Sequence, residues 1–220
     1  MIQAKTSYAV ITGDIVASSQ LPDADRRQLY DVMKRGAVEL QRVYPDAVPL
    51  QVDIFRGDSW QLLVSDIRQT LRIALFYRLY IKIQTKNVSD SRESIGVGTI
   101  QFVPETRVSE GTGPAYQISG KGLDGLKQAR MSLRFEDNPD FDSQAEILIM
   151  VIDSLVTDLT ERQALAVFGA LQDWLQKDIV ALWDPPITQQ AVSDHLKSAR
   201  WELLKKSIAY IEENLLQACV

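Results

Sequence analysis

The apolar positions between residues 1 and 155 change repeatedly from strand-like runs to helical spacing. Tyr8–Ile11 is a short apolar run that leads into Thr12-Gly13-Asp14, which is typical of a buried strand. Between Asp25 and Val43 the apolar residues recur near helical spacing, which predicts an amphipathic helix. The pattern then predicts a hairpin, with strands over Val52–Phe55 and Trp60–Val64 joined by a tight turn at Gly57-Asp58. A helix over Ile67–Ile83 and a strand over Ser94–Phe102 follow. A turn at Ser119-Gly120 then opens a helix within Ala115–Arg130, and a last strand is predicted over Ile147–Val151.

This order of elements predicts an α+β fold. The sequence β-α-β-β-α-β-α-β is typical of an α/β sandwich with helices on one face of a mostly antiparallel sheet. The ferredoxin-like arrangement fits it best. In such a sheet the first strand and the hairpin are neighbours.

The rest of the chain has helical patterns and no strand pattern. The breaker in this region is Asp184-Pro185-Pro186. We place a boundary between Ser154 and Thr160 and expect an α/β domain over 1–155 and a helical domain over 156–220. The helices are predicted over Leu159–Trp174, Gln176–Leu182, Thr188–Leu196 and Arg200–Leu216.

Composition and charge narrow the class of protein. The 220 residues are 45% hydrophobic and 24% charged, which is ordinary for a globular protein. With Cys219 as the one cysteine, no leader-like start and no apolar run of membrane-spanning length, we expect a cytoplasmic protein with no membrane partner. The net charge of −5 argues against wrapping nucleic acid over a large surface but permits a local basic patch.

Two acidic residues carry candidate chemistry. Asp14 stands where the first strand runs out, and Asp58 stands at the hairpin turn. If both meet at one edge of the sheet, their carboxylates and nearby carbonyls form an oxygen site suited to Mg²⁺ or Mn²⁺ with substrate phosphates. The glycine beside each aspartate lets backbone approach a phosphate closely. The alternative is that both are turn residues, because Gly-Asp suits turn geometry.

Four stretches of the sequence together resemble a known family. They are Ile11–Ser19, Phe55–Gln61, Ile95–Ile100, and Gly113–Tyr116 with Ser119-Gly120. This combination is similar to the SatD family of bacterial and phage proteins. The first three stretches also resemble class III nucleotide cyclases.

The cyclase resemblance implies a metal and nucleotide site. It implies that Asp14 and Asp58 are metal ligands and that the backbone of Ile15 adds a further contact. Proteins of this kind usually work as homodimers with the site at the interface. The nucleotide, through its phosphates, would lie near these residues: Gly13, Val16, Ala17, Ser18 and Ser19.

Other positions depart from the cyclase pattern. Where cyclases carry an Asn and an Arg that act on the transition state, this chain has Asp124 and Gln128, and neither replaces the charge of an arginine. We therefore assign no catalytic residue and expect binding without efficient turnover. Lys121, after Gly120 at a predicted helix start, either meets a phosphate or is solvated. Arg56 either holds a phosphate or pairs with Asp53.

The helical tail resembles a helix-turn-helix. Thr188 is a good N-cap, and the next helix is similar to the recognition helix of small bacterial regulators. The tail from Thr157 onward has six basic and nine acidic residues, so any DNA contact would be weak and local. The alternative is a helical bundle for self-association. The candidate DNA-binding residues are Thr188, Gln189, Gln190, Ser193, Lys197 and Arg200.

Three functions are compatible with these features. The first is a transcriptional regulator that binds a nucleotide with Mg²⁺ and couples it to DNA binding through the tail. The second is a divergent nucleotide cyclase or nucleotidyl-transfer enzyme. The third is an interaction or oligomerisation protein in which both aspartates are turn residues.

Overall fold

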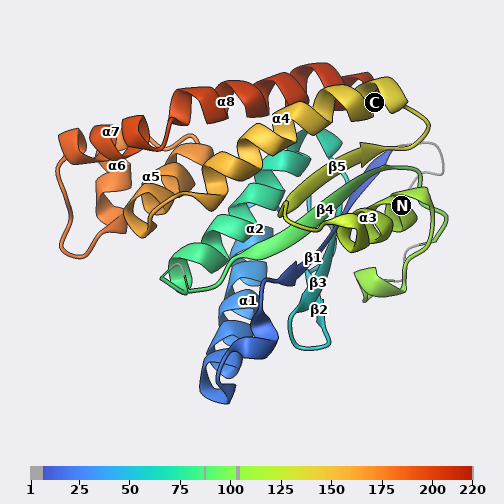
Figure 1. Ribbon diagram of the computed structural model, residues 1–220, viewed down its shortest axis with the longest axis horizontal. Helices are drawn as coiled ribbons and strands as arrows, with labels where there is room; N and C mark the ends of the chain where they lie inside the picture. Colours follow the sequence, from blue (N-terminus) through green and yellow to red (C-terminus); the bar gives the residue numbers. More distant parts are fainter. Residues whose placement is uncertain (1–6, 87, 103–104, 220) are drawn as a thin grey trace.

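The structure is a computed structural model that describes residues 7–86, 88–102 and 105–219 (Figure 1). The α+β class is confirmed. One five-stranded sheet has the order β2-β3-β1-β4-β5. Its first four strands in sequence, with the helices between them, follow the βαββαβ order of a ferredoxin-like unit. These elements are β1 (Tyr8–Ile15), α1 (Asp23–Val43), β2 (Asp53–Phe55), β3 (Ser59–Val64), α2 (Thr70–Gln84) and β4 (Ser91–Gly98).

The predicted last strand over Ile147–Val151 is wrong. That segment lies within helix α4 (Pro139–Thr157), which Asn138 caps by accepting a hydrogen bond from the Phe141 amide at 3.2 Å. The helix buries Ile149 but leaves Ile147 and Met150 68% and 62% exposed, so this apolar run has helical spacing.

The fifth strand is β5 (Met131–Phe135), which pairs with β4 in parallel. It buries Met131, Leu133 and Phe135 and alternates them with Ser132 and Arg134. This is the period-two pattern of a strand, over a short and partly polar segment. Because β5 is parallel to β4 and the other pairs are antiparallel, the sheet is mixed.

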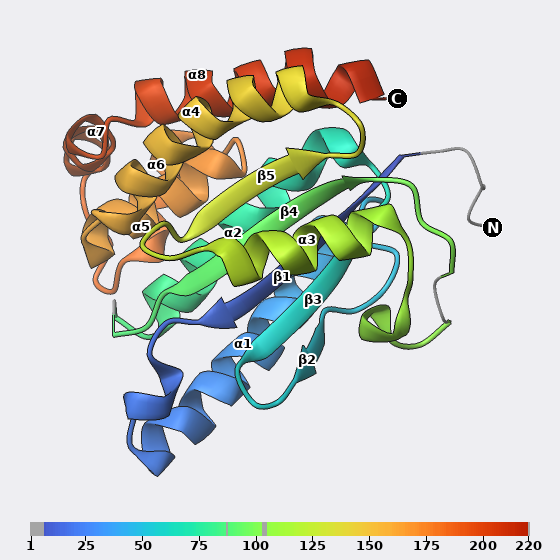
Figure 2. The same cartoon turned by 45° about the vertical axis from the view of Figure 1, so that its right-hand side comes forward.

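Helices cover both faces of the sheet, and not one face as expected (Figure 2). Helices α1 and α2 pack on one face, and α3 (Pro114–Gly125) lies across β4 and β1 on the other. A Cβ at Gly96 of β4 would lie 2.3 Å from the Ala115 carbonyl oxygen, so glycine permits this close approach. The helix begins at Pro114, and the turn predicted at Ser119-Gly120 is therefore inside it.

The tail is helical, as the sequence predicts. It consists of α5 (Glu161–Leu171), α6 (Gln176–Ile179), α7 (Gln189–Ser198), α8 (Trp201–Tyr210) and a π-helical segment over Ile211–Leu216. Helix α8 runs beside α4, and α5 packs on α2. The main cluster of buried apolar residues extends from Ala9 to Leu216, so the tail shares the core of the α/β part.

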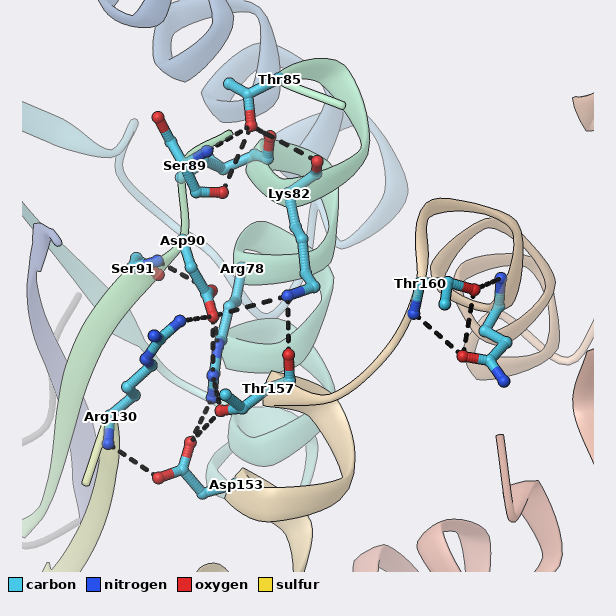
Figure 3. A network of polar contacts seen from close by, with 12 residues as sticks. Arg78, Lys82, Thr85, Ser89, Asp90, Ser91, Arg130, Asp153, Thr157 and Thr160 are labelled. Atoms are coloured by element: carbon cyan, nitrogen blue, oxygen red, sulfur yellow. Dashed lines mark hydrogen bonds and ion pairs between the residues drawn. The ribbon is translucent and has the colours of Figure 1, made fainter. Parts of the chain in front are cut away.

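A buried network of hydrogen bonds and ion pairs connects the end of α4 with α2 and with the start of β4 (Figure 3). The Arg78 side chain is 0% exposed. Its Nε lies 2.9 Å from Asp90 Oδ1, and its Nη1 lies 2.8 Å from Asp153 Oδ1. Lys82 Nζ donates to the carbonyl oxygen of Thr157 at 3.0 Å, at the end of α4.

Two carboxyls of this region have opposite electrostatic behaviour. Burial alone would raise the pKa of Asp90, but the charges and hydrogen bonds of Arg78, Lys82 and Arg130 together outweigh it and hold that pKa below its usual value. Glu93, three residues later, is fully buried, and burial raises its pKa well above the usual range. The carboxylates that contact Arg78 directly are those of Asp90 and Asp153.

None of the helices in the described ranges is both long and apolar enough to cross a lipid bilayer.

Candidate functional site

The end of β1 and the β2–β3 turn are adjacent, as the predicted sheet requires. Asp14 pairs opposite Ser59 across the two antiparallel strands, and Asp58 precedes Ser59. The turn reverses through Arg56 and Gly57, which both have positive φ angles of 55° and 88°. Gly57 suits this conformation because it has no Cβ. The two sequence stretches that carry the candidate acids therefore end side by side.

The Asp58 carboxylate is held from both stretches. It accepts a hydrogen bond from the Ser18 hydroxyl at Oδ2 and a longer one from the Ser59 hydroxyl at Oδ1, at 3.4 Å. Ser18 follows β1, and Asp58 lies forty residues later in the hairpin. This hydrogen bond joins the loop after β1 to the hairpin turn.

A cleft of about 890 Å³ lies between the hairpin turn and the first turns of α1. Its walls carry hydroxyl groups from Ser18 and Ser19 and aromatic rings from Tyr30 and Phe55. They also carry three arginines and three aspartates: Arg26, Arg27, Arg56, Asp23, Asp31 and Asp58. A concave site with apolar walls and a few charged groups is typical of a small-molecule pocket.

The three arginines that line the cleft differ in whether they have a polar partner. Arg26 forms an ion pair with Asp23 of the same helix. Arg27 and Arg56 are exposed and have no polar partner among the residues that the structure describes. The alternative pairing of Arg56 with Asp53 does not form. The Asp53 carboxylate instead accepts hydrogen bonds from the Ser109 backbone amide, at 3.2 Å, and from the Ser109 hydroxyl, and it forms an ion pair with Arg107. Two guanidinium groups are therefore free to meet an anion.

Asp14 has a different environment from Asp58. Its carboxylate accepts from Arg92 of β4, at 2.9 Å between Nε and Oδ1 and by a second bond from Nη2 to Oδ2. Arg92 Nη1 also donates to the carbonyl oxygen of Leu126, just after α3, at 3.2 Å. Asp14 is not among the residues that line the cleft.

The observed groups do not fit a divalent cation as they stand. No group of three or more His, Cys, Asp or Glu side chains in the described part of the chain could hold a metal ion. Both oxygens of Asp14 are engaged by a guanidinium, which already neutralises the carboxylate. The metal role of Asp14, Ile15 and Asp58 therefore stays a prediction.

Of the other residues expected near the phosphates, some line the cleft and others do not. Ser18 and Ser19 line the cleft. The Val16 amide donates to the carbonyl oxygen of Asp90 at 2.9 Å, which ties the chain after β1 to the start of β4. Ala17 is exposed with a φ angle of 53°, and Ile15 is buried in the core.

Gly13 lies against a core residue, and Lys121 lies inside a helix away from the cleft. A Cβ at Gly13 would lie 2.4 Å from the Trp60 ring, so this glycine makes room for a buried tryptophan. Lys121 is exposed in the middle of α3, on the face of the sheet opposite α1, and does not stand at a helix start. It is not among the residues lining the cleft.

The candidate DNA-binding residues lie on α7 and just beyond it. The Thr188 hydroxyl accepts from the Ala191 amide at 3.1 Å, so the predicted N-cap is confirmed. Val192 and Leu196 are buried. Of the candidates, Ser193 is half-buried and the others are exposed: Thr188, Gln189, Gln190, Lys197 and Arg200. The role of these residues in DNA binding stays a prediction.

Sequence reasoning missed several groups at this site. Arg26 and Arg27 form a basic pair in the first turn of a helix that the sequence pattern predicts. Their position beside the hairpin follows from that helix and the topology of the sheet. Arg92 precedes the strand predicted from Ser94, and no local pattern marks it. Its partnership with Asp14 depends on the register of β1 against β4.

Comparisons with known proteins include a distant structural likeness. No protein-family model matches the chain, and no curated protein matches its sequence. A crystal structure of the guanylyl cyclase Cya2 aligns with a TM-score of 0.41 at 13% sequence identity, over 58% of this chain and 74% of that one. The SatD resemblance stays a prediction, and this distant likeness assigns no activity.

Proposed function

We propose that this protein binds a nucleotide in the cleft between α1 and the β2–β3 turn. The observation that carries the proposal is the meeting of two motifs at one cleft: Ser18 of the first motif and Arg56, Gly57 and Asp58 of the second line its walls. Residues distant in sequence that converge on one pocket are a common basis for a binding site.

The chemistry of the cleft suits a phosphorylated ligand. Arginine presents a planar fork of donors that matches phosphate oxygens, and Arg27 and Arg56 are free to use it. The ring of Phe55 offers an apolar surface for a base. The volume of about 890 Å³ is within the usual range for small-molecule pockets.

The proposed role is binding with regulation, in preference to catalysis. The positions where a cyclase would need an Asn and an Arg hold Asp124 and Gln128. Asp14, the first expected metal ligand, is paired with Arg92. A divergent cyclase or nucleotidyl-transfer enzyme is the alternative, and formation of cyclic product or pyrophosphate from a nucleoside triphosphate would favour it.

The expected result for the cleft is a loss of nucleotide affinity without a loss of stability. Arg27→Ala and Arg56→Ala should each weaken ATP or GTP binding roughly 10- to 150-fold, because a hydrogen bond to a charged group contributes about 1.5–3 kcal/mol. Isothermal titration calorimetry with the full chain, in EDTA and in Mg²⁺, measures this affinity.

The matched control is Arg35→Ala. Arg35 is an exposed arginine of the same helix and does not line the cleft. Its replacement should leave the affinity unchanged. Equal effects at Arg35 and Arg56 would mean that general charge, and not the cleft, attracts the nucleotide.

A second proposal concerns α7. We propose that this helix contacts DNA, because it buries Val192 and Leu196 and leaves Gln189, Gln190 and Lys197 exposed, as a recognition helix requires. Coupling between the cleft and the tail would run through the shared core, in which α5 packs on α2. A homodimer stays a prediction.

Removal of two cations should reduce the salt dependence of DNA binding. The double variant Lys197→Ala with Arg200→Ala should lower the slope of log affinity against log salt by about 2, since each phosphate contact contributes about 0.9. Fluorescence anisotropy with duplex DNA at several salt concentrations measures the slope. Arg162→Ala, an exposed cation on α5, is the control. An unchanged slope in the double variant would remove α7 from the interface.

A further inference from the structure

We infer that Arg92 is a built-in counter-ion of Asp14 and excludes a divalent cation from this end of the sheet. A ligand of the cleft would then bind without a metal ion. Ligand binding without a metal ion rests on the proposed function, whereas exclusion of the cation concerns Asp14 and Arg92 alone.

The register of the sheet places these two side chains together. Asp14 and Arg92 are directly opposite in the antiparallel β1–β4 pair, so their side chains share one face of the sheet. That face is the one covered by α3, since the Thr12 hydroxyl, two residues before Asp14, lies 2.9 Å from the hydroxyl of Ser119 of α3. The pair is part of the sheet and does not depend on a mobile loop.

The guanidinium is held at three points. Two of its nitrogens donate to the two oxygens of Asp14, and its Nη1 donates to the Leu126 carbonyl oxygen at 3.2 Å. The Asp14 contact is the largest cause of a raised pKa at Arg92, so its charge is constant at working pH. The Arg92 side chain is 33% exposed and that of Asp14 is 22% exposed, so the pair is accessible to solvent.

A divalent ion at Asp14 would have to displace this arginine. The ion and the guanidinium have like charge and need the same carboxylate oxygens. Asp58, which precedes the residue opposite Asp14 in the β1–β3 pair, is held by Ser18 and lines the cleft. One neutralised and one separately held carboxylate make a poor site for Mg²⁺, which takes its ligands in strict octahedral geometry.

The experiment measures Mn²⁺ binding to the full chain without nucleotide, by the electron paramagnetic resonance signal of free Mn²⁺. The wild-type protein should show no saturable site that depends on Asp14. Arg92→Gln should bind Mn²⁺ at least about tenfold more tightly, because it removes a like charge that lies only a few ångströms from the ion. The double variant Asp14→Asn with Arg92→Gln should lose that binding.

Two controls separate charge from structure. Arg92→Lys keeps the positive charge and should bind Mn²⁺ no better than wild type. If Arg92→Gln does not fold, Arg92→Met removes the same charge and takes its place, with the same expected gain in Mn²⁺ binding. Arg68→Gln removes an exposed arginine that also pairs with an aspartate, Asp66, and should leave Mn²⁺ binding unchanged.

Two results would overturn the inference. One is a saturable Mn²⁺ site in the wild-type protein that Asp14→Asn abolishes. The other is equal Mn²⁺ binding by folded wild-type, Arg92→Lys and Arg92→Gln proteins. Failure of the proposed function is a separate result, namely no ATP or GTP binding by wild type in either EDTA or Mg²⁺, and it leaves the Mn²⁺ measurements valid.

Discussion

Replacing Arg78 by methionine should lower the free energy of unfolding by about 3–5 kcal/mol, because it leaves the buried Asp153 carboxylate without its counter-ion. Asp90 also loses its contact with Arg78 and keeps its ion pairs with Lys82 and Arg130. Arg78 is fully buried and contacts Asp90 at 2.9 Å and Asp153 at 2.8 Å. Its Nη2 also donates to the Thr157 hydroxyl at 2.8 Å. Urea unfolding followed by circular dichroism measures the loss.

The control for this prediction is Arg68→Met. Arg68 pairs with Asp66 at 2.9 Å but is 55% exposed, so its loss should cost less than about 1 kcal/mol. The double change of Arg78 and Asp153 to apolar residues should recover part of the loss, since it removes one unpaired charge. Similar losses for Arg78→Met and Arg68→Met would show that the buried network does not hold α4 in place.

Replacing Trp60 by alanine should also lower the free energy of unfolding by about 3–5 kcal/mol, through the cavity that it leaves. Trp60 is fully buried on β3, and its ring meets Tyr77 edge to face with centroids 4.8 Å apart. Its Nε1 has no hydrogen-bond partner among the described residues, so the loss comes from packing.

The control is Trp174→Ala, because Trp174 is 40% exposed. Its loss should cost far less in the same urea experiment. A Trp60→Ala protein as stable as Trp174→Ala would contradict the close packing of β3 on α2. It would also remove the reason for glycine at position 13, where a Cβ would lie 2.4 Å from the Trp60 ring.

The sequence predicts the core of the fold well, because the apolar residues of its main strands and helices recur at clear strand or helix spacing. The strand over Tyr8–Ile11, the hairpin around Gly57 and the long helix after Asp25 all form. The error at Ile147–Val151 arose because a run of apolar residues is compatible with both strand and helix. Its exposed Ile147 and Met150 show that a helix can carry apolar side chains on its solvent face.

The candidate site could be predicted only in part. Local motifs indicate Ser18 and Asp58, which meet through a hydrogen bond. The Asp14–Arg92 pair depends on strand register between residues far apart in the chain, and single-sequence patterns do not set that register. The Ser119-Gly120 pair is typical of a turn and predicts a helix start before Lys121, whereas the helix begins at Pro114.

The most direct test of the central claim is hydrogen–deuterium exchange of the full chain with and without saturating ATP or GTP in EDTA. If the cleft binds the nucleotide, exchange slows over Ser18–Asp31 and Ile54–Asp58, the segments that form its walls. Exchange that is unchanged in both segments, or slowed only elsewhere in the chain, would contradict the claim.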